Sequence, residues 1–383
     1  MPIILIISFS EIRRDPRVLR QIRTLNNQYQ ITVAGFGCKP DLNIKYIKFN
    51  NIRKTFWQKL VLVIQYLLKS YEQIYWHNSC VRSGVEKIIN QKFDLVIAND
   101  VETLPLALKL ASGRPVLLDA HEYAPRQFED RLLWRMIVMP YKNYICKTYL
   151  PRVSGMITVC EGIAKEYLRV YKVNSRVITN APYRENLNPS PIQNATIRII
   201  HHGGTNPSRK QEKMIKLMEY LDDRYTLDFM LMPSKPKYLT KLRKLAANNK
   251  RIRFVEPVPM PHICQRINEY DIGLYILEPN GFNQMHSLPN KLFEYIQARL
   301  AVAIGPSPEM ANIVNRYKLG VVAKSFDPRD LANILNSLSS QDIKKFKEAS
   351  HRAADELCFE VNANILLKEI ERLLMKVPSP CAS

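Results

Sequence analysis

The most constraining feature of this chain is a series of short apolar runs separated by longer segments of helical periodicity. Each run is five to eight residues long and rich in isoleucine, leucine and valine, which is typical of strands buried on both faces of a parallel sheet. Strands that alternate with helices along the chain predict a parallel sheet covered by helices. In the first half, strands are predicted at residues 3–8, 31–36, 94–100, 115–120 and 155–160.

A proline-rich segment at residues 181–195 interrupts the alternation, which then restarts. This segment holds three prolines and no apolar periodicity, as expected of a linker. The 383 residues also exceed the size of one compact core. We therefore predict an α/β chain of two domains, at residues 1–180 and 196–358, with a cleft between them. Strands of the second domain are predicted at 197–204, 225–232, 251–257, 271–277, 301–305 and 320–324.

The formal net charge of +21 predicts a polyanionic partner: nucleic acid, an anionic membrane or phosphorylated substrates. A solvated basic surface is the alternative. By count, residues 1–190 hold 28 Lys and Arg against 15 Asp and Glu, and the remainder holds 28 against 20. No nucleic-acid motif stands out, so nucleic acid is not an expected partner.

Cysteine usage and hydropathy indicate the compartment. The seven cysteines are scattered and form no C-x-x-C pair, which fits a reducing cytosol and disfavours disulfides or a zinc knuckle. The apolar start MPIILIIS lacks a preceding basic region, so we interpret it as a strand and not as a signal peptide. No apolar stretch approaches the 18 or so residues that a membrane span needs. A cytoplasmic location is expected.

Charged motifs follow the predicted strands, where ligands bind in open parallel sheets. In HHGGTNPSRK (201–210), Gly203 and Gly204 allow close backbone approach, and Arg209 and Lys210 add two cations next to a helix start. This combination would suit a diphosphate. A plain strand–turn–helix with solvated cations is the alternative.

In SLPNKLFEYIQAR (287–299), Ser287 is expected to cap a helix whose first turn contains Pro289. Lys291 and Glu294 are three residues apart, so they share one side of that helix. The lysine could neutralise a phosphate, and the carboxylate could accept both ribose hydroxyls. A surface helix with a solvated Lys–Glu pair is the alternative.

Two motifs of the first domain also follow strands. Asp119 lies at the end of the strand at 115–120, and His121 and Glu122 follow it. Histidine is the side chain best suited to proton or hydrogen-bond work near neutral pH. A structural histidine at a strand end is the alternative. Arginines 13, 14, 17 and 20 follow the first strand and could bind a phosphate of a second substrate, or simply face solvent. The chain has no D-x-D, so no metal site is predicted.

Together these motifs resemble those of the bacterial retaining glycosyltransferases of family 4, of the kind that builds surface polysaccharide such as capsule or O-antigen. The resemblance implies the GT-B fold: two Rossmann-like domains with parallel sheets facing a central cleft, and a final helix, about 359–376, that packs back on the first domain. It rests on D-x-R-V (15–18), AND-x-x-TLP (98–105), DAHE (119–122), ITVCEGIAKEY (157–167), HHGGTNPSRK, PNKLFEY (289–295), PEM (308–310) and G-V-V…DP (320–328).

The resemblance implies that a nucleotide sugar is held mainly by the second domain, without metal or other cofactor. UDP is the nucleotide expected by default, and GDP is the alternative. His121 would contact the transferred sugar, Glu294 the ribose, and Arg209 and Lys291 the diphosphate. The residues expected to bind the sugar donor are Gly203, Gly204, Arg209, Lys210, His286, Lys291, Glu294 and Glu309. The amides of the 305–310 turn would donate further hydrogen bonds to it. The acceptor set is Ser10, Arg14, Asp15, Arg17 and Asp100.

One departure keeps other functions open. His286 stands where the family often carries a glutamate, eight residues before Glu294. A non-catalytic GT-B subunit that scaffolds a partner transferase is therefore an alternative, and a sugar-nucleotide epimerase is a more distant one.

Two segments predict a membrane contact. Residues 56–71 carry Trp57 and a stripe of apolar residues, with Lys54, Lys59 and Lys69 nearby, and residues 131–150 mix aromatics and cations in the same way. Such segments can lie in a membrane interface, or they can pack on the sheet as ordinary core helices. A glycan or lipid-diphosphate acceptor at the inner face of the cell membrane would fit the former.

Overall fold

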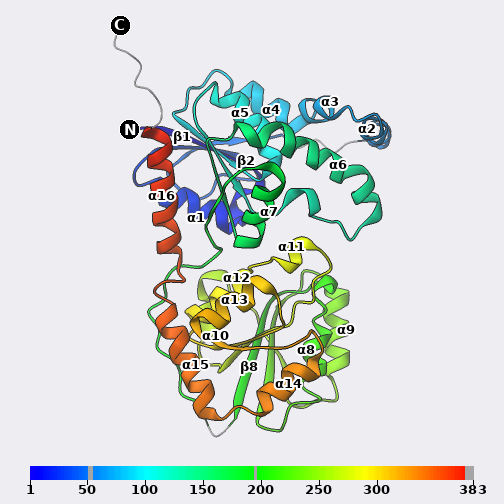
Figure 1. Ribbon diagram of the computed structural model, residues 1–383, viewed down its shortest axis with the longest axis vertical. Coiled ribbons are helices and arrows are strands. Elements are labelled where there is room, and N and C mark those ends of the chain that lie inside the picture. The colour runs from blue at the N-terminus through cyan, green and yellow to red at the C-terminus, as the bar shows by residue number, and fades with distance from the viewer. Residues whose placement is uncertain (51–54, 194–195, 376–383) are drawn as a thin grey trace. The chain divides into compact units, whose positions relative to one another are not determined.

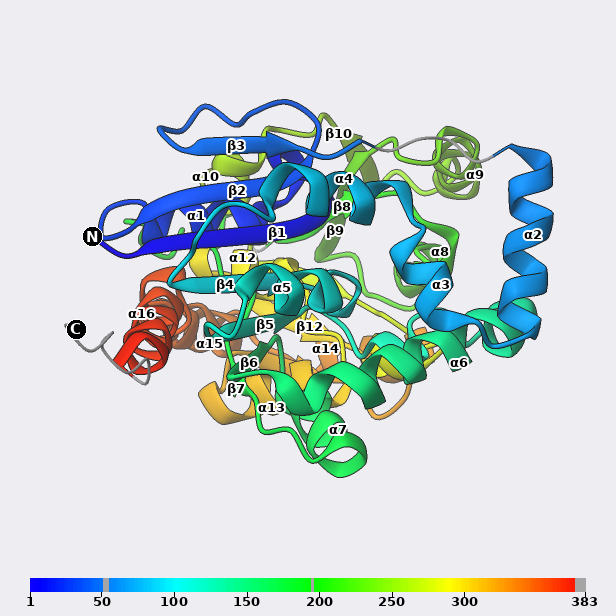
Figure 2. The same cartoon turned by 90° about the horizontal axis from the view of Figure 1, so that it is seen from above.

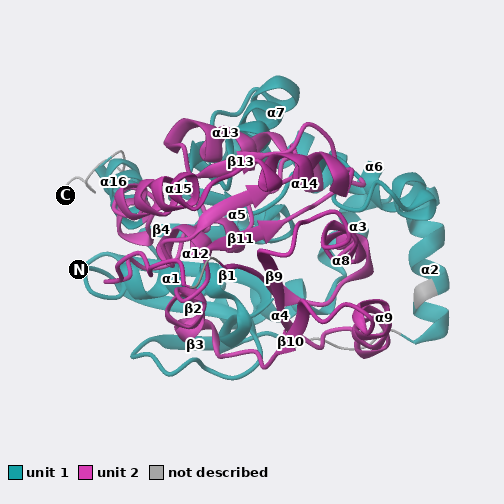
Figure 3. Ribbon diagram, turned by 90° about the horizontal axis from the view of Figure 1, so that it is seen from below, with its two compact units in different colours: residues 1–178, 281–283, 363–383 teal, residues 179–280, 284–362 magenta. Residues whose placement is uncertain are grey.

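The computed structural model describes residues 1–50, 55–193 and 196–375, and these form two compact units (Figure 3). Unit 1 comprises residues 1–178, 281–283 and 363–383, and unit 2 comprises residues 179–280 and 284–362. The boundary therefore lies between Ile178 and Thr179, and the segment predicted as a linker groups with unit 2.

Unit 1 is built on a seven-stranded parallel sheet with the order β3-β2-β1-β4-β5-β6-β7 (Figure 2). Ile4 of β1 pairs with Ile31 on one side and with Leu95 on the other. All five predicted strands form, and β3 and β7 were missed because they are short and partly exposed. The strands are β1 Ile3–Glu11, β2 Gln30–Phe36, β3 Lys45–Lys48, β4 Leu95–Asn99, β5 Val116–Ala120, β6 Gly155–Thr158 and β7 Arg176–Val177.

Helices cover both faces of this sheet, since residues 4–7 of β1 are fully buried. Asp15 caps α1 by accepting a hydrogen bond from the Val18 amide, and Pro16 occupies the first turn. Leu366, Ile370 and Leu373 of α16 share one core with strand residues of unit 1. The helices are α1 Pro16–Leu25, α2 Phe56–Leu67, α3 Tyr71–Trp76, α4 Ser79–Ile88, α5 Leu104–Ala111, α6 Leu132–Tyr149, α7 Glu161–Tyr171 and α16 Phe359–Met375, which joins unit 1 from Ala363.

Unit 2 is built on a six-stranded parallel sheet with the order β10-β9-β8-β11-β12-β13. Figure 1 labels its strand β8. All six predicted strands form. Because the order reverses between β8 and β11, the carboxyl ends of these two strands are the expected position of a ligand. The strands are β8 Ile197–Gly204, β9 Tyr225–Met232, β10 Ile252–Val255, β11 Ile272–Tyr275, β12 Ala301–Ile304 and β13 Gly320–Val322.

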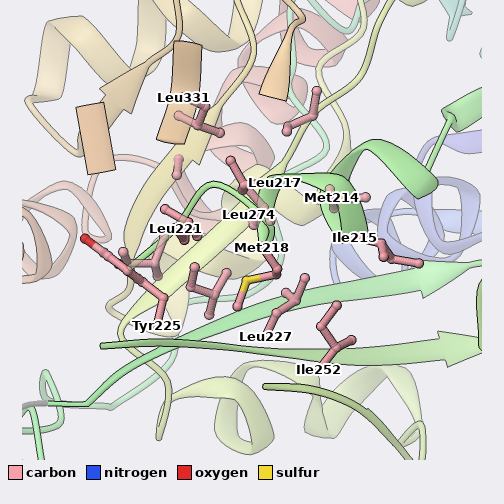
Figure 4. Packing of buried hydrophobic residues seen from close by; sticks show 14 of the residues in the cluster. Met214, Ile215, Leu217, Met218, Leu221, Tyr225, Leu227, Ile252, Leu274 and Leu331 are labelled. Atoms are coloured by element: carbon pink, nitrogen blue, oxygen red, sulfur yellow. The ribbon is translucent and has the colours of Figure 1, made fainter. Parts of the chain in front are cut away.

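The core of unit 2 lies between its sheet and its helices. Met214 and Leu217 of α8, and Met218 at its C-terminal end, pack with Leu227 of β9 and Leu274 of β11 (Figure 4). The helices of unit 2 are α8 Glu212–Leu217, α9 Pro236–Ala246, α10 Ile263–Ile267, α12 Asn290–Gln297, α13 Pro308–Tyr317, α14 Pro328–Asn336 and α15 Ser340–Ala353, while α11 Phe282–Met285 spans the boundary of the two units. In the described part of the chain, no helix is both long and apolar enough to cross a bilayer.

Candidate functional site

A pocket of about 900 Å³ opens in unit 2 at the carboxyl end of β8. The turn after β8, the loop after β10 and the start of α12 contribute its walls. Cations and a carboxylate line one part, and prolines with aliphatic side chains line another, so the pocket suits a ligand with an anionic part and a flat apolar part. Its lining residues are His202, Gly203, Gly204, Arg209, Met232, Pro257, Val258, Pro259, Met260, Ile263, Pro289, Asn290, Lys291 and Glu294.

The start of α12 differs from the sequence-based expectation. Pro289 is the N-cap, with extended backbone angles of φ −74° and ψ 152°, and the helix begins at Asn290. Ser287 therefore lies two residues before the cap, and its buried hydroxyl makes no hydrogen bond within the described part of the chain. The prediction that Ser287 caps the helix and Pro289 sits in its first turn is wrong.

Lys291 and Glu294 are buried, each only 7% exposed, so the alternative of a solvated surface pair is wrong. The Lys291 ammonium lies over the Tyr275 ring, 5.0 Å from its centroid. Burial, and after it the Arg209 charge, lowers the pKa of Lys291 to about 7, although Glu294 opposes this shift. Burying a lysine beside an arginine costs free energy unless an anion pairs with them, so this position favours the binding of an anion.

His202 is buried next to Glu294 and forms a group with it and Lys291. Its Nε2 atom lies 3.4 Å from Glu294 Oε2 and makes no hydrogen bond among the described residues. Burial, followed by the charges of Lys291 and His201, lowers the pKa of His202 well below its usual range. His202 is therefore a neutral imidazole that can steer the carboxylate of Glu294.

Gly203 makes room for the lysine. Its φ of +120° lies in the region that favours glycine, and a Cβ atom there would lie 2.7 Å from Lys291 Nζ. Gly204 is similarly close to Ser234, at 2.9 Å from Oγ. The backbone conformation of Gly203 thus requires glycine, whereas a side chain at Gly204 would only require the Ser234 hydroxyl to move.

The structure separates the two adjacent cations of the SRK motif. Arg209 lines the pocket and donates a hydrogen bond to the Gly204 carbonyl at 3.4 Å. Lys210 has a φ of +46° and donates to Glu278 at 2.7 Å, where Lys213 also pairs at 2.8 Å. Lys210 does not line this pocket, because its ammonium pairs with Glu278, and its part in the donor site stays a prediction.

His286 and Glu309 form a pair of their own. The Nδ1 atom of His286 lies 2.9 Å from Oε1 of Glu309, which is in the first turn of α13. Neither residue lines the 900 Å³ pocket.

The predicted residues of the first domain gather at the carboxyl ends of β1, β4 and β5 in unit 1. The His121 amide donates to Asp100 Oδ1 at 3.0 Å, and the ring nitrogens lie 3.4 Å from Asp100 Oδ2 and 3.7 Å from Asp119 Oδ2. Burial lowers the pKa of His121, but Asp100 and Asp119 outweigh it and the pKa is raised. Two carboxylates thus favour a protonated His121.

Asp100 itself adopts an unusual backbone, with φ +65° and ψ 155°. This region is sparsely populated for any residue but glycine, and such strain gathers at functional sites. Lys142 and Glu102 form an ion pair nearby, and burial lowers the pKa of Lys142 to about 8 while Asp100 opposes that shift.

The acceptor residues predicted at the end of β1 divide into bound and exposed groups. Arg17 is buried, and its Nε and Nη2 atoms donate hydrogen bonds to the carboxylate of Asp119 at 2.8 and 2.6 Å. Burial would raise the pKa of Asp119, but Arg17 and then His121 lower it to about 2. Arg17 is therefore not the accessible cation that the sequence predicted.

The other three acceptor residues lie around the start of α1. Ser10 Oγ donates to Asp15 Oδ2 at 2.7 Å, while the other oxygen of Asp15 caps α1. Arg14 is exposed and lies 3.4 Å from Glu11. Sequence reasoning thus placed these residues after β1, but it missed the carboxylate partners that several of them have.

Other functional candidates were missed. Two groups of residues carry no chemical motif: Tyr275, the last residue of β11, and the loop residues 257–260 that follow β10. Only their position at the carboxyl ends of these strands could have drawn attention to them. Among the residues that the structure describes, no group of three or more His, Cys, Asp or Glu side chains is arranged to hold a metal ion.

Comparisons with known proteins bear on the fold. No protein-family model matches the chain, and no curated protein matches it significantly. HepE from Anabaena, in complex with UDP-glucose, superposes with a TM-score of 0.71 at 14% identity, over 97% of this chain and 100% of that one. Sucrose-phosphate synthase from Thermosynechococcus elongatus gives 0.73 at 12% identity, over 98% and 100%. A glycosyltransferase from Rickettsia africae gives 0.70 at 14% identity, over 98% and 99%. The chain has the GT-B fold that these proteins share, as predicted.

Proposed function

We propose that this chain is a retaining glycosyltransferase that moves a sugar from a UDP-sugar to a glycan or lipid-linked acceptor in surface polysaccharide biosynthesis. The observation that carries the proposal is the buried Lys291–Glu294–His202 group, which faces Arg209 in a pocket of unit 2. Two structural neighbours with the same fold were crystallised with UDP-glucose or with UDP-2-fluoro glucose.

In this proposal Arg209 and Lys291 neutralise the diphosphate, since charge-assisted hydrogen bonds to phosphate are strong in a buried site. Glu294 accepts the ribose hydroxyls, and neutral His202 lies 3.4 Å from its carboxylate. The base lies against the apolar wall that Pro257 and Met260 belong to.

The transfer breaks the bond between the anomeric carbon and the diphosphate oxygen, and an acceptor hydroxyl forms the new bond on the same face of the sugar. The hydroxyl proton leaves with the departing diphosphate. Protonated His121 donates a hydrogen bond to the transferred sugar, and Asp100 orients His121 through the 3.0 Å hydrogen bond to its amide. The cations stabilise the charge on the leaving group, which is the largest contribution that a protein can make here.

Metal independence is part of the proposal. The sequence has no D-x-D, and the pocket presents Arg209 and Lys291 where a divalent ion would otherwise neutralise the diphosphate. The scaffold alternative rested on His286. His286 stands where the family often carries a glutamate, but it forms a hydrogen bond with Glu309. A carboxylate is therefore still present next to position 286, and this favours the catalytic function.

The proposal also places the protein at the cytoplasmic face of the cell membrane. α2 exposes nearly all its large apolar side chains, and the first turns of α6 expose Leu132, Leu133 and Met136. Amphipathic helices with this character lie in membrane interfaces. Of the three cations predicted near this segment, Lys54 lies outside the described residues, as does the side chain of Lys59. Lys69 follows the end of α2 and has a φ of +54°.

The test is donor binding by thermal shift, followed by transfer of labelled sugar to a membrane lipid extract with EDTA in excess. A UDP-sugar at a hundred times its Kd should stabilise the wild type by about 2.7 kcal/mol. Glu294→Gln should lose most of this shift, because each hydrogen bond to the charged carboxylate contributes about 1.5–3 kcal/mol.

Glu219→Gln, an exposed glutamate of the same unit, is the matched control and should behave as wild type. A folded Glu294→Gln variant with unchanged affinity would contradict the ribose assignment. Binding without transfer to any lipid fraction would favour the scaffold function, and loss of transfer in EDTA with rescue by Mg²⁺ would contradict metal independence.

A further inference from the structure

The charge of the C-terminal half is concentrated in one segment. By count, residues 179–383 hold 29 Lys and Arg against 21 Asp and Glu, a net charge of +8. Residues 233–253 alone hold 8 Lys and Arg and no Asp or Glu, also a net charge of +8. The rest of this half is therefore neutral, with 21 residues of each sign. A generally basic surface does not produce such a distribution.

The segment folds into α9 and the turns on either side of it. α9 packs beside α8 (Figure 1) and buries Tyr238, Leu242 and Ala246 as its inner stripe. Lys237, Lys241 and Lys244 are exposed. They follow each other at intervals of four and three residues, so they form one stripe on the opposite side of the helix. Lys235 precedes the helix and Lys250 follows it, and both are exposed. We call these five lysines the α9 ridge.

The ridge is poorly neutralised by the protein itself. Within the described part of the chain only Lys241 has an acidic partner, Glu212, at a long 3.8 Å. By contrast, the last two arginines of the segment have acidic partners: Arg251 pairs with Asp223 at 3.7 Å, and Arg253 pairs with Asp228 at 2.9 Å. Like charges one helical turn apart repel each other. A ridge of this kind costs stability in isolation, and an external anion removes that cost.

We propose that the α9 ridge is an electrostatic docking surface for an anionic lipid bilayer. The ridge runs along the exposed face of a helix and none of its lysines lines the donor pocket, so it matches a planar array of headgroups better than it matches a single bound molecule. Leu245, 53% exposed next to Lys244, adds an apolar side chain that can enter the headgroup layer. Clusters of four to eight basic residues on an amphipathic helix are typical of such surfaces.

This docking surface is separate from the one proposed on α2, because it belongs to unit 2 and acts by charge. It also borders the donor site. The Lys235 amide donates to Thr205 Oγ1 at 2.8 Å, and Met232, at the end of β9, lines the donor pocket. Docking through α9 would hold the donor-binding unit itself at the lipid surface.

The test is co-sedimentation of the full-length protein with phosphatidylcholine vesicles that contain phosphatidylglycerol, at low ionic strength. The ridge variant is Lys237→Glu, Lys244→Glu and Lys250→Glu. Loss of each lysine should weaken the partition coefficient roughly fivefold, or about 100-fold for all three before added repulsion. The matched control is Lys216→Glu, Lys324→Glu and Lys344→Glu, which makes the same change in net charge with exposed lysines elsewhere in unit 2.

The expected result is a large loss for the ridge variant and little change for the control. Equal sedimentation of the two variants would overturn the proposal, because net charge alone would then explain binding. Unchanged vesicle binding with lost retention on heparin would also overturn it, in favour of an anionic polymer. Thermal shift with a UDP-sugar, measured on both variants, shows that they are folded and separates this outcome from a failure of the proposed transferase function.

Discussion

At the scale of single residues, the pocket that we propose as the donor site is distinguished by buried charge. Lys291 and Glu294 look like an ordinary surface pair in the sequence, and the structure buries both beside Arg209. The consequence is a lysine whose pKa falls from 10.5 to about 7. A group that titrates near neutral pH in the free protein makes anion binding sensitive to pH, and this can be measured.

We predict that donor affinity falls as the pH rises above about 7. Below that pH, Lys291 is already protonated in the free protein, so affinity is constant. A bound diphosphate raises the pKa of Lys291, so between the free and the bound pKa values the donor must bring a proton with it, and affinity falls by up to about tenfold per pH unit. Titration calorimetry of a UDP-sugar in buffers of different ionisation enthalpy measures this proton uptake.

Lys291→Arg is the control, because arginine stays protonated throughout. Its affinity should be lower but nearly independent of pH from 7 to 9. If wild type and Lys291→Arg showed the same pH dependence, Lys291 would not be the group that takes up the proton.

At the scale of elements, much of the architecture was predictable. All eleven strands predicted from apolar runs are present, and the central ones were easiest to recognise, because burial on both faces leaves a run of aliphatic residues. β3 and β7 could not be found, since their exposed edges carry mixed residues. The turn after β8 was located because its glycines permit close approaches. The Lys210–Glu278 and Arg17–Asp119 pairs could not be predicted, because they join residues 68 and 102 positions apart.

The exposure of α2 distinguishes the two interpretations of its sequence. Trp57 is 72% and Leu67 is 69% exposed, so these side chains are not ordinary core. α2 nevertheless has a complete capping box between Thr55 and Gln58, which stabilises a helix that buries little of its surface. A well-capped, apolar and exposed helix is expected to bury its surface against something outside unit 1.

We predict that Trp57→Ser combined with Leu67→Ser abolishes most vesicle binding by unit 1 and leaves the stability nearly unchanged. Burying such side chains contributes about 1.5–3 kcal/mol each to docking, whereas exposed substitutions usually change stability by about 0.5 kcal/mol or less. Vesicle co-sedimentation at high salt, where the α9 ridge is screened, isolates this contribution. Ile89→Ser with Leu168→Ser, less exposed positions of the same unit, is the control. A drop of several degrees in Tm would instead show that α2 is packed as core.

At the scale of the whole molecule, each unit has a core of its own. The cluster around Met214 and Leu274 contains only residues of unit 2, and the cluster around Ile4 and Ile370 contains only residues of unit 1. Cores that share no residues are expected to melt separately, and then a single Tm does not describe the chain. The donor pocket lies wholly within unit 2, so a nucleotide should stabilise one transition and not the other.

The tryptophans make this prediction easy to check, because Trp57, Trp76 and Trp134 are the only three in the chain and all belong to unit 1. A UDP-sugar at a hundred times its Kd stabilises unit 2 by about 2.7 kcal/mol, which for a unit of this size raises its Tm by about 5–10 °C. Circular dichroism should therefore show one transition that moves, while tryptophan fluorescence shows a transition that stays. Glu294→Gln should remove the movement without affecting the fluorescence transition. If the donor raised both midpoints equally, the two units would unfold as one cooperative body, and the prediction that they melt separately would be wrong.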